Sequence, residues 1–172
     1  NSPEIARRCG ATVLKHVVNR GQGASLQTGF DYVRTMTDAE YCVTFDSDGQ
    51  HGVLDALAMV DALRETGADI ALASRFRGTT EGMSRMRGLV LKAGVWFTRR
   101  SAKLDVTDTH NGLRVLRRTA LNSIRLRLDR MAHASELLSA IVPAGLSYIE
   151  VPVRVEYSEH SRAKGQANIA AI

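Results

Sequence analysis

Long hydrophobic runs and cysteine patterns are missing from this sequence. No stretch approaches the roughly 18 consecutive apolar residues that a membrane-spanning helix needs, and the start does not have the pattern of a signal peptide. The two cysteines, Cys9 and Cys42, show no spacing typical of a disulfide framework or a zinc site, so we expect two buried thiols. Internal repeats and low-complexity tracts are absent as well. These absences predict a cytoplasmic protein without a disulfide scaffold.

The overall composition is that of one soluble globular domain. Hydrophobic residues make up 44% of the chain and charged residues 24%, which are ordinary fractions for such a protein. A chain of 172 residues is long enough to bury roughly two-thirds of its unfolded surface. A single hydrophobic core is therefore expected.

Positive charge is concentrated in one part of the chain. Residues 75 to 103 contain eight basic residues and one acid, Glu81, so this part of the chain has a charge of +7. The rest of the chain sums to −2, which gives the net charge of +5. Such asymmetry favours an anionic partner for one surface, whether a phosphate, a lipid headgroup or nucleic acid. The basic residues are Arg75, Arg77, Arg85, Arg87, Lys92, Arg99, Arg100 and Lys103.

Hydrophobic patterning predicts strands that alternate with helices. Short apolar runs indicate strands at 12–14, 41–45, 70–73 and 148–155. Helical periodicity and end signals indicate helices at 2–9, after the loop 19–24, and at 53–66, 83–100, 119–124 and 133–140. In the helix 53–66, we expect one side to be buried, formed by Val53, Leu57, Val60 and Leu63. This alternation is typical of a three-layer α/β/α fold with a mainly parallel sheet.

An acidic cluster directly after the strand 41–45 is the strongest functional signal. Asp46 and Asp48 lie two residues apart, followed by Gly49 and Gln50. Two such carboxylates suit one hard divalent cation, Mg²⁺ or Mn²⁺, although Asp and Gly are also common in turns without any ligand. Arg75 follows the strand 70–73, and ligands of α/β sheets bind at the carboxyl ends of strands. One sheet edge is thus expected to hold both a cation and a guanidinium suited to phosphate.

Four other segments have two interpretations each. The loop 19–24 is either an anion site at a helix N-terminus or a flexible connection. The basic helix 83–100 either lies on the anionic inner surface of a membrane or packs its apolar side on the sheet. Glu136 is either a general base or a solvated carboxylate, and the polar tail after residue 155 is either a frayed end or a lid.

Several of these segments together resemble family 2 glycosyltransferases, in particular the branch of dolichol-phosphate mannose synthase and other polyprenyl-phosphate glycosyltransferases. The resemblance runs in order from about residue 1 to residue 166. It is carried by Asn19-Arg20-Gly21-Gln22-Gly23, by Thr44-Phe45-Asp46-Ser47-Asp48-Gly49-Gln50-His51, by Ser74-Arg75-Phe76, by Asp108-Thr109-His110-Asn111-Gly112 and by Glu150-Val151-Pro152-Val153.

The resemblance implies a GT-A fold and transfer of a sugar, with inversion, from a UDP- or GDP-linked donor. It implies that Asp46, Asp48 and Gln50 hold the metal on the donor diphosphate. We also expect Asp48 to be a catalytic residue. Donor contacts fall on Arg20, Gly21, Gln22 and Gly23. Substrate phosphate contacts fall on Arg75 and Arg162, and Lys164 adds charge in the tail.

Two departures from the family pattern bear on the expected domain. An opening strand with Pro-x-x-Asn-Glu and a second strand ending in Asp-Asp-Gly-Ser are absent, so we expect a GT-A domain over residues 1–155 that lacks its first β-α-β unit, followed by a tail or lid over 156–172. Gly52 and Val53 also stand where Asp-Pro is common. We expect this second change to affect only the shape of the turn.

The expected activity depends on the acceptor. A polyprenyl phosphate is already an anion and needs cations such as Arg75 and Arg162 to position it, whereas a hydroxyl of a cell-envelope glycan needs a base, for which Glu136 is the choice. The alternatives are a nucleotidyltransferase acting on a sugar phosphate and a non-enzymatic anion- or nucleic-acid-binding domain. The arginines of the basic stretch lack the interleaved aromatic platform that single-strand binding favours, so we expect no nucleic acid. A homo-oligomer is left open.

Overall fold

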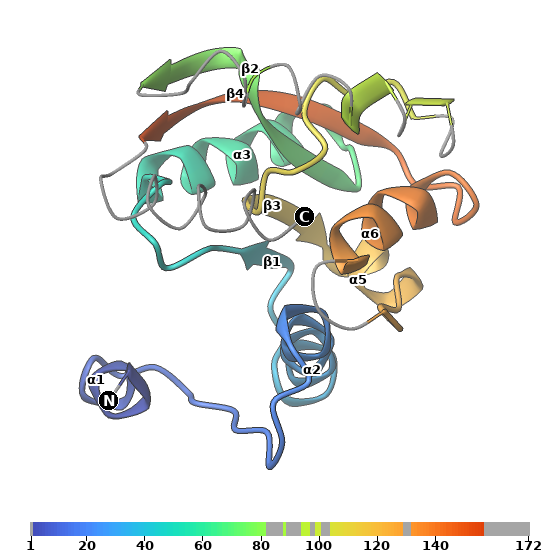
Figure 1. Cartoon of the computed structure of the whole chain (residues 1–172). Helices are drawn as coiled ribbons and strands as arrows, with labels where there is room; N and C mark the ends of the chain where they lie inside the picture. Colours follow the sequence, from blue (N-terminus) through green and yellow to red (C-terminus); the bar gives the residue numbers. More distant parts are fainter. Residues whose placement is uncertain are drawn as a thin grey trace.

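The computed structural model describes residues 2–81, 88, 94–96, 99–100, 104–128 and 132–156. Its helices include α1 (Ser2–Arg8), α2 (Gln22–Met36), α3 (Val53–Thr66), α5 (Arg118–Ser123) and α6 (His133–Ile141). Residues 94–96 and 99–100 are helical as well, within the predicted helix 83–100. The strands are β1 (Tyr41–Thr44), β2 (Ile70–Glu81), β3 (Arg114–Arg117) and β4 (Tyr148–Glu156). Figure 1 shows α1 apart from the sheet, at the end of an extended segment.

The strands form one sheet in the order β1-β3-β2-β4. β3 runs antiparallel to both of its neighbours, β1 and β2, and β2 pairs in parallel with β4. β1, β2 and β4 therefore share one direction, as the alternation of strands and helices predicts, and β3 is inserted between them in reverse. Figure 1 shows β2 and β4 side by side along their length. The amino end of β3 consequently lies beside the carboxyl end of β1 and beside Leu72 of β2, and β2 continues from there to Glu81.

Each face of the sheet is covered by helices through its own hydrophobic cluster. Side chains of β2 alternate between the two faces, as expected for a strand buried on both sides. Ile70 and Leu72 pack with α2, α5 and α6, while Ala71 and Ala73 pack with α3. The predicted three-layer α/β/α arrangement is confirmed.

Local signals place several helix ends where the sequence predicts them. α3 has the predicted bounds and ends at Gly67, whose φ of 73° is left-handed and whose N–H donates to the carbonyl of Leu63. Glycine is the residue that adopts this conformation without a steric penalty. α5 and α6 each begin and end within one residue of the predicted helices.

The buried side of α3 is only partly the predicted one. Leu63 is buried and Val60 partly buried, as predicted, whereas Val53 and Leu57 are 67% and 54% exposed. Ala56 and Met59 are buried in their place. Apolar residues occur on both sides of this helix, so their spacing alone could not select the buried side. The packing of α3 on the small side chains of β2 selects it.

Two further expectations are wrong. Residues 12–14 are not a strand and are largely exposed, because no strand of the described chain lies beside them to supply ladder hydrogen bonds. Cys9 is exposed, since it follows a helix with no buried residues, and Cys42 is half-buried; both are free thiols.

Three expectations concern parts of the chain that the structure describes sparsely or not at all. Most of the predicted helix 83–100 and the tail from residue 157 onward lie outside the described residues. Membrane contact through this helix and the role of the tail therefore stay predictions. No helix in the described ranges is both long and apolar enough to cross a membrane.

Candidate active site

The candidate site lies at the end of the sheet where β1 ends and β3 begins. Asp46 and Asp48 follow β1, and the segment 107–112 leads into β3. Arg75 lies within β2 and not after it, because this strand continues to Glu81, beyond the predicted end at residue 73. The segment 108–112 connects the other two, since Asp108 pairs with Arg75 at 2.6 Å and Gly112 lies against the Asp46 carboxylate. The fold thus brings Asp46 and Arg75 to opposite ends of one short segment.

The Asp46 carboxylate lies against the backbone of β3's leading segment. A Cβ atom on Gly112 would stand only 2.0 Å from Asp46 Oδ2, so no larger residue fits there while Asp46 keeps its place. Thr44 Oγ1 donates to the Gly112 carbonyl at 2.6 Å, and Gln22 Nε2 donates to Asp46 Oδ1 at 3.1 Å. Asp46 is thus positioned by β1, by the start of α2 and by the entry to β3.

Asp48 is held within its own turn. The backbone N–H and the side-chain amide of Gln50 donate to its two carboxylate oxygens at 3.2 and 2.7 Å, and Gly49 supplies a left-handed φ of 77°. Next to this turn, burial, together with the charge of Arg75, lowers the pKa of His51 despite the nearby carboxylates. His51 Nδ1 is buried without a partner among the described residues.

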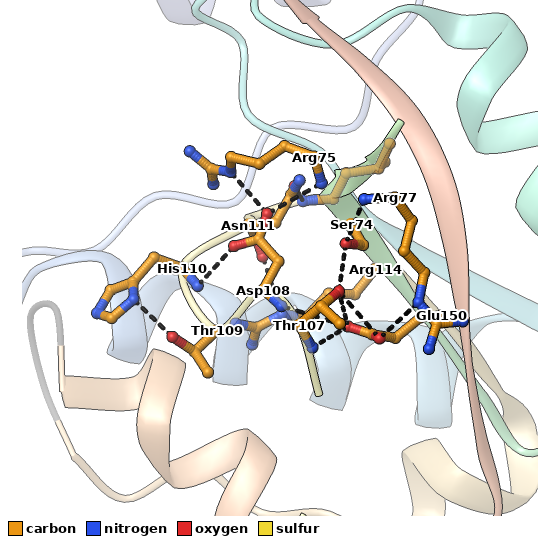
Figure 2. A network of polar contacts seen from close by, with 11 residues as sticks. Ser74, Arg75, Arg77, Thr107, Asp108, Thr109, His110, Asn111, Arg114 and Glu150 are labelled. Atoms are coloured by element: carbon orange, nitrogen blue, oxygen red, sulfur yellow. Dashed lines mark hydrogen bonds and ion pairs between the residues drawn. The ribbon is translucent and has the colours of Figure 1, made fainter. Parts of the chain in front are cut away.

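Arg75 and Asp108 form a buried ion pair. Arg75 Nε and Asp108 Oδ2 are 2.6 Å apart, and the side chains are 6% and 1% exposed. The same oxygen accepts the Arg75 backbone N–H at 3.1 Å, and Asp108 Oδ1 accepts the N–H of His110 at 3.3 Å. Figure 2 shows this pair at the centre of a polar network that joins β2, the segment 107–111 and β4.

A second buried cation, Arg114, lies beside a small hollow. Its side chain donates to the carbonyls of Asn111 and Ala134, and burial lowers its pKa to about 10 even though Asp108 and Asp46 oppose this. The hollow measures about 80 Å³ and is lined by Gln22, Asp46, Asn111, Arg114, His133 and Leu137, among others. Asn111 Nδ2 is buried there without a partner in the described chain. Such a donor is unusual in an interior and suits an incoming oxygen.

His110 adds a hydrogen-bonding imidazole beside the ion pair. Burial lowers the pKa of His110, Arg75 and Arg114 lower it further, and Asp108 opposes the shift. Its Nδ1 lies 2.8 Å from Thr109 Oγ1. The site therefore combines fixed carboxylates, fixed guanidinium groups and uncharged hydrogen-bonding groups.

Comparison with known proteins identifies the family. The family model described as "Glycosyl transferase family 2" matches residues 1–125. The chain belongs to glycosyl transferase family 2.

Two relatives extend the likeness over most of this family 2 chain. Uncharacterized protein MJ1222 of Methanocaldococcus jannaschii is 32% identical over 168 residues, which cover 94% of this chain and 68% of the relative. The UDP-N-acetylglucosamine–dolichyl-phosphate N-acetylglucosaminyltransferase of Methanococcus voltae is 30% identical over 158 residues, covering 88% of this chain and 62% of the relative. The chain thus spans about two-thirds of the length of these relatives.

Solved structures confirm the GT-A fold. Glucosyl-3-phosphoglycerate synthase of Mycobacterium tuberculosis with bound phosphoglyceric acid matches with a TM-score of 0.67 at 21% identity, covering 90% of this chain and 56% of the synthase. The same synthase with Mn²⁺, UDP-glucose and phosphoglyceric acid matches with a TM-score of 0.64 at 20% identity, covering 90% and 55%. Both sequence resemblance and fold class are therefore as predicted.

Within this family 2 chain, the predicted donor loop is only partly joined to the acidic cluster. Gln22 reaches Asp46, as described above. Gly21 is the N-cap of α2 with a φ of 87°, its N–H donates to Asn19 Oδ1, and Gly23 is buried in the first turn. Arg20 is exposed and lines a separate hollow with Asn19 and four other residues.

Two groups of predicted residues are not placed in the site. The carboxylate of Glu136 accepts hydrogen bonds from the backbone N–H groups of Arg127 and Leu128 at 2.9 to 3.0 Å, so it holds the segment before α6. It is not among the residues that line the hollow beside Arg114. Arg162 and Lys164 lie outside the described residues.

Sequence reasoning missed the roles of four polar residues that are buried here. Asp108, Arg114 and His133 are 3%, 5% and 5% exposed as residues, and the Glu150 side chain is 2% exposed. Asp108 belongs to a segment predicted as a polar turn, and Arg114 and Glu150 interrupt otherwise apolar strands. A charged residue within an apolar strand was the available signal, because such residues are seldom buried unless paired.

Proposed function

We propose that this chain transfers a sugar from a nucleotide-diphosphate sugar to a polyprenyl phosphate, with inversion at the anomeric carbon and with a divalent cation. The observation that carries the proposal is that the segment 108–112 contacts both the acidic cluster, through Gly112 and Asp46, and Arg75, through Asp108. This segment thereby connects oxygen ligands for a cation with a fixed guanidinium for a phosphate. Family membership supports the same reaction class.

The residues at the end of β1 fit a divalent cation chemically. Mg²⁺ and Mn²⁺ prefer oxygen ligands, and Asp46, Asp48 and the amide oxygen of Gln50 provide them. Gly112 leaves the space that the Asp46 carboxylate needs. No group of three His, Cys, Asp or Glu side chains suited to a metal occurs in the described part of the chain, so the donor diphosphate would complete the coordination. A bound cation would offset the negative charge that develops on the leaving diphosphate.

The donor sugar is expected beside the hollow between the acidic cluster and α6. Asn111 Nδ2 and Arg114 are hydrogen-bond donors there, and Asp46 and Gln22 lie at its wall. Hydroxyl groups both donate and accept, so this mixture suits a sugar. UDP is the nucleoside diphosphate we expect, since a structural neighbour holds UDP-glucose and a relative is named for UDP-N-acetylglucosamine.

A phosphate acceptor agrees with the contacts of Glu136, the residue predicted as a general base. An oxygen of the acceptor phosphate attacks the anomeric carbon, and the bond from that carbon to the diphosphate breaks with its electron pair leaving on the nucleoside diphosphate. No proton has to be removed from an acceptor that is already an anion. Glu136, the predicted base for a hydroxyl acceptor, has its carboxylate bound by two backbone amides, which favours the phosphate over a glycan hydroxyl.

Calorimetric titration tests the donor site. We expect UDP to bind in the presence of Mn²⁺ and to bind far more weakly without it, with GDP as the competing nucleotide. Asp46→Ala and Asp48→Ala should each abolish the effect of the metal, while the exposed Asp61→Asn on α3 serves as the matched control. Metal-independent binding in all these proteins would refute the assignment of the acidic cluster.

A transfer assay tests the acceptor. With UDP-sugar and a polyprenyl phosphate, the expected product besides the glycolipid is nucleoside diphosphate; release of pyrophosphate would indicate a nucleotidyltransferase instead. Arg75→Ala should reduce transfer to the lipid phosphate far more than hydrolysis of the donor. Equal losses in both reactions would count against Arg75 as a contact of the acceptor phosphate.

A further inference from the structure

Glu150 is a buried carboxylate that lies at the base of the polar network in Figure 2. It belongs to β4, opposite Leu72 of β2, and its side chain is 2% exposed. It accepts hydrogen bonds from the N–H of Thr107 at 2.7 Å, from Thr107 Oγ1 at 3.0 and 3.1 Å and from the N–H of Asp108 at 3.3 Å. One carboxylate thus fixes two consecutive residues of the segment that leads into β3.

The charge of Glu150 is compensated from one side. Arg77 Nε lies 3.1 Å from Glu150 Oε2, and the Arg77 side chain is 52% exposed. Burial of a carboxylate is costly unless it is paired and hydrogen-bonded, and an apolar residue of similar volume often stabilises a fold equally well. Glu150 therefore contributes something that an apolar residue in this strand would not, namely a fixed place for the backbone of 107–108.

That fixed backbone continues to Arg75 through Asp108. The backbone N–H of Asp108 donates to Glu150, and the Asp108 carboxylate accepts both the backbone N–H and the Nε–H of Arg75. Ser74 Oγ and Thr107 Oγ1, 2.6 Å apart, close the connection between β2 and the segment 107–108. The contacts form an unbroken path from Glu150 on β4 to the guanidinium of Arg75.

We infer that Glu150 is a positioning residue for Arg75: it orients the guanidinium, through Thr107 and Asp108, for the phosphate group of the acceptor. The inference rests on the proposed function for the nature of that phosphate. Glu150 itself reaches neither the acidic cluster nor the hollow beside Arg114 through the described contacts. Its effect on the reaction is therefore indirect, and we expect it in the binding of the acceptor phosphate rather than in the rate of the bound complex.

The first test compares Glu150→Gln with Glu156→Gln in the natural full-length polypeptide. Glu156 lies on the same strand but pairs with Arg154 at the surface, with both side chains more than half exposed. For Glu150→Gln we expect the KM for polyprenyl phosphate to rise about tenfold, since a hydrogen-bonded buried charge is lost. The value of kcat and the dissociation constant for UDP with Mn²⁺ should change by no more than about twofold, and Glu156→Gln should match the parent protein.

A purely structural role for Glu150 predicts a different pattern. Loss of folding would lower every activity in proportion to the folded fraction and leave the KM values unchanged, and this pattern would overturn the inference. Thr107→Val is a milder second variant, because it removes only the hydroxyl bonds to Glu150 and Ser74. We expect it to raise the KM for the lipid phosphate about threefold with the fold intact, and an unchanged KM would also contradict the inference.

A second measurement does not depend on activity. In nitrogen-15 NMR spectra, the Nε–H proton of Arg75 should exchange slowly with water because it is buried against Asp108. Glu150→Gln should speed this exchange at least tenfold, and Glu156→Gln should not change it. An unchanged Arg75 signal in Glu150→Gln would overturn the inference whatever the enzyme does. A faster exchange in a protein that transfers no sugar to any polyprenyl phosphate would support the positioning role and refute the proposed function.

Discussion

Replacing Gly112 with Ala should disable the metal site while leaving the fold largely intact. The added Cβ would lie 2.0 Å from Asp46 Oδ2 and 2.8 Å from Asp46 Cγ, whereas ordinary contact begins at 3.4 Å. Since the Gly112 backbone is tied to Thr44 and followed by the fully buried Leu113, the carboxylate has to move rather than the strand. The oxygen must retreat by about 1.4 Å, several times the roughly 0.2 Å tolerance of a metal–ligand distance.

The expected loss in metal-dependent binding follows from this displacement. Disturbing the residues that orient a metal ligand typically costs 10- to 100-fold in affinity, so we expect Gly112→Ala to raise the dissociation constant for UDP with Mn²⁺ by about that factor. The free energy of unfolding should fall by no more than about 1 kcal/mol, because the half-buried Asp46 side chain can rotate toward solvent. Calorimetry measures the first quantity and urea denaturation the second.

A matched control is available in α2. Gly29→Ala adds the same methyl group where nothing lies within 4 Å, so it should leave UDP binding unchanged and stabilise the helix by about 0.5 to 1 kcal/mol. If Gly112→Ala bound UDP with Mn²⁺ as tightly as Gly29→Ala, Asp46 would not be a metal ligand held in place by this glycine. A loss of binding that merely followed global unfolding would equally refute the reasoning.

Three further predictions concern the buried network and the thiols. Asp108→Ala leaves the Arg75 guanidinium buried without its ion-pair partner, so urea denaturation should show a loss of about 3 to 5 kcal/mol; a loss below about 1 kcal/mol would contradict the burial. Because the pKa of His110 is lowered by burial, the unfolded chain binds a proton there first as the pH falls; the urea midpoint should therefore decrease below about pH 6.5, and His110→Gln should weaken that dependence. Cys9 is exposed, whereas burial raises the pKa of the half-buried Cys42, so a thiol reagent at pH 8 should modify Cys9 at least tenfold faster by mass spectrometry, and equal rates would contradict both placements.

Much of the fold was determined by short-range features of the sequence. The bounds of α3 follow from an apolar periodic segment that ends at Gly67, and β1, β2 and β4 begin where short apolar runs predict strands. The run at 12–14 is not a strand, and β3 was not predicted. The acidic cluster at the end of β1 and the order of the motifs were sufficient to predict the family and the GT-A fold. These features depend on residues within a few positions of one another, where helix caps, glycine conformation and side-chain periodicity act.

Tertiary structure decided which polar residues meet and which sides of the elements are buried. Asp108 contacts Arg75 across 33 positions of sequence, and Glu150 contacts Thr107 across 43. These pairs exist because β3 is inserted in reverse between β1 and β2 and because β4 adds in parallel to β2. The buried side of α3 and the absence of a strand at 12–14 have the same origin, since each depends on which surface lies opposite. Strand order and register cannot be read from local patterns, and they set the distances over which a buried charge finds its partner.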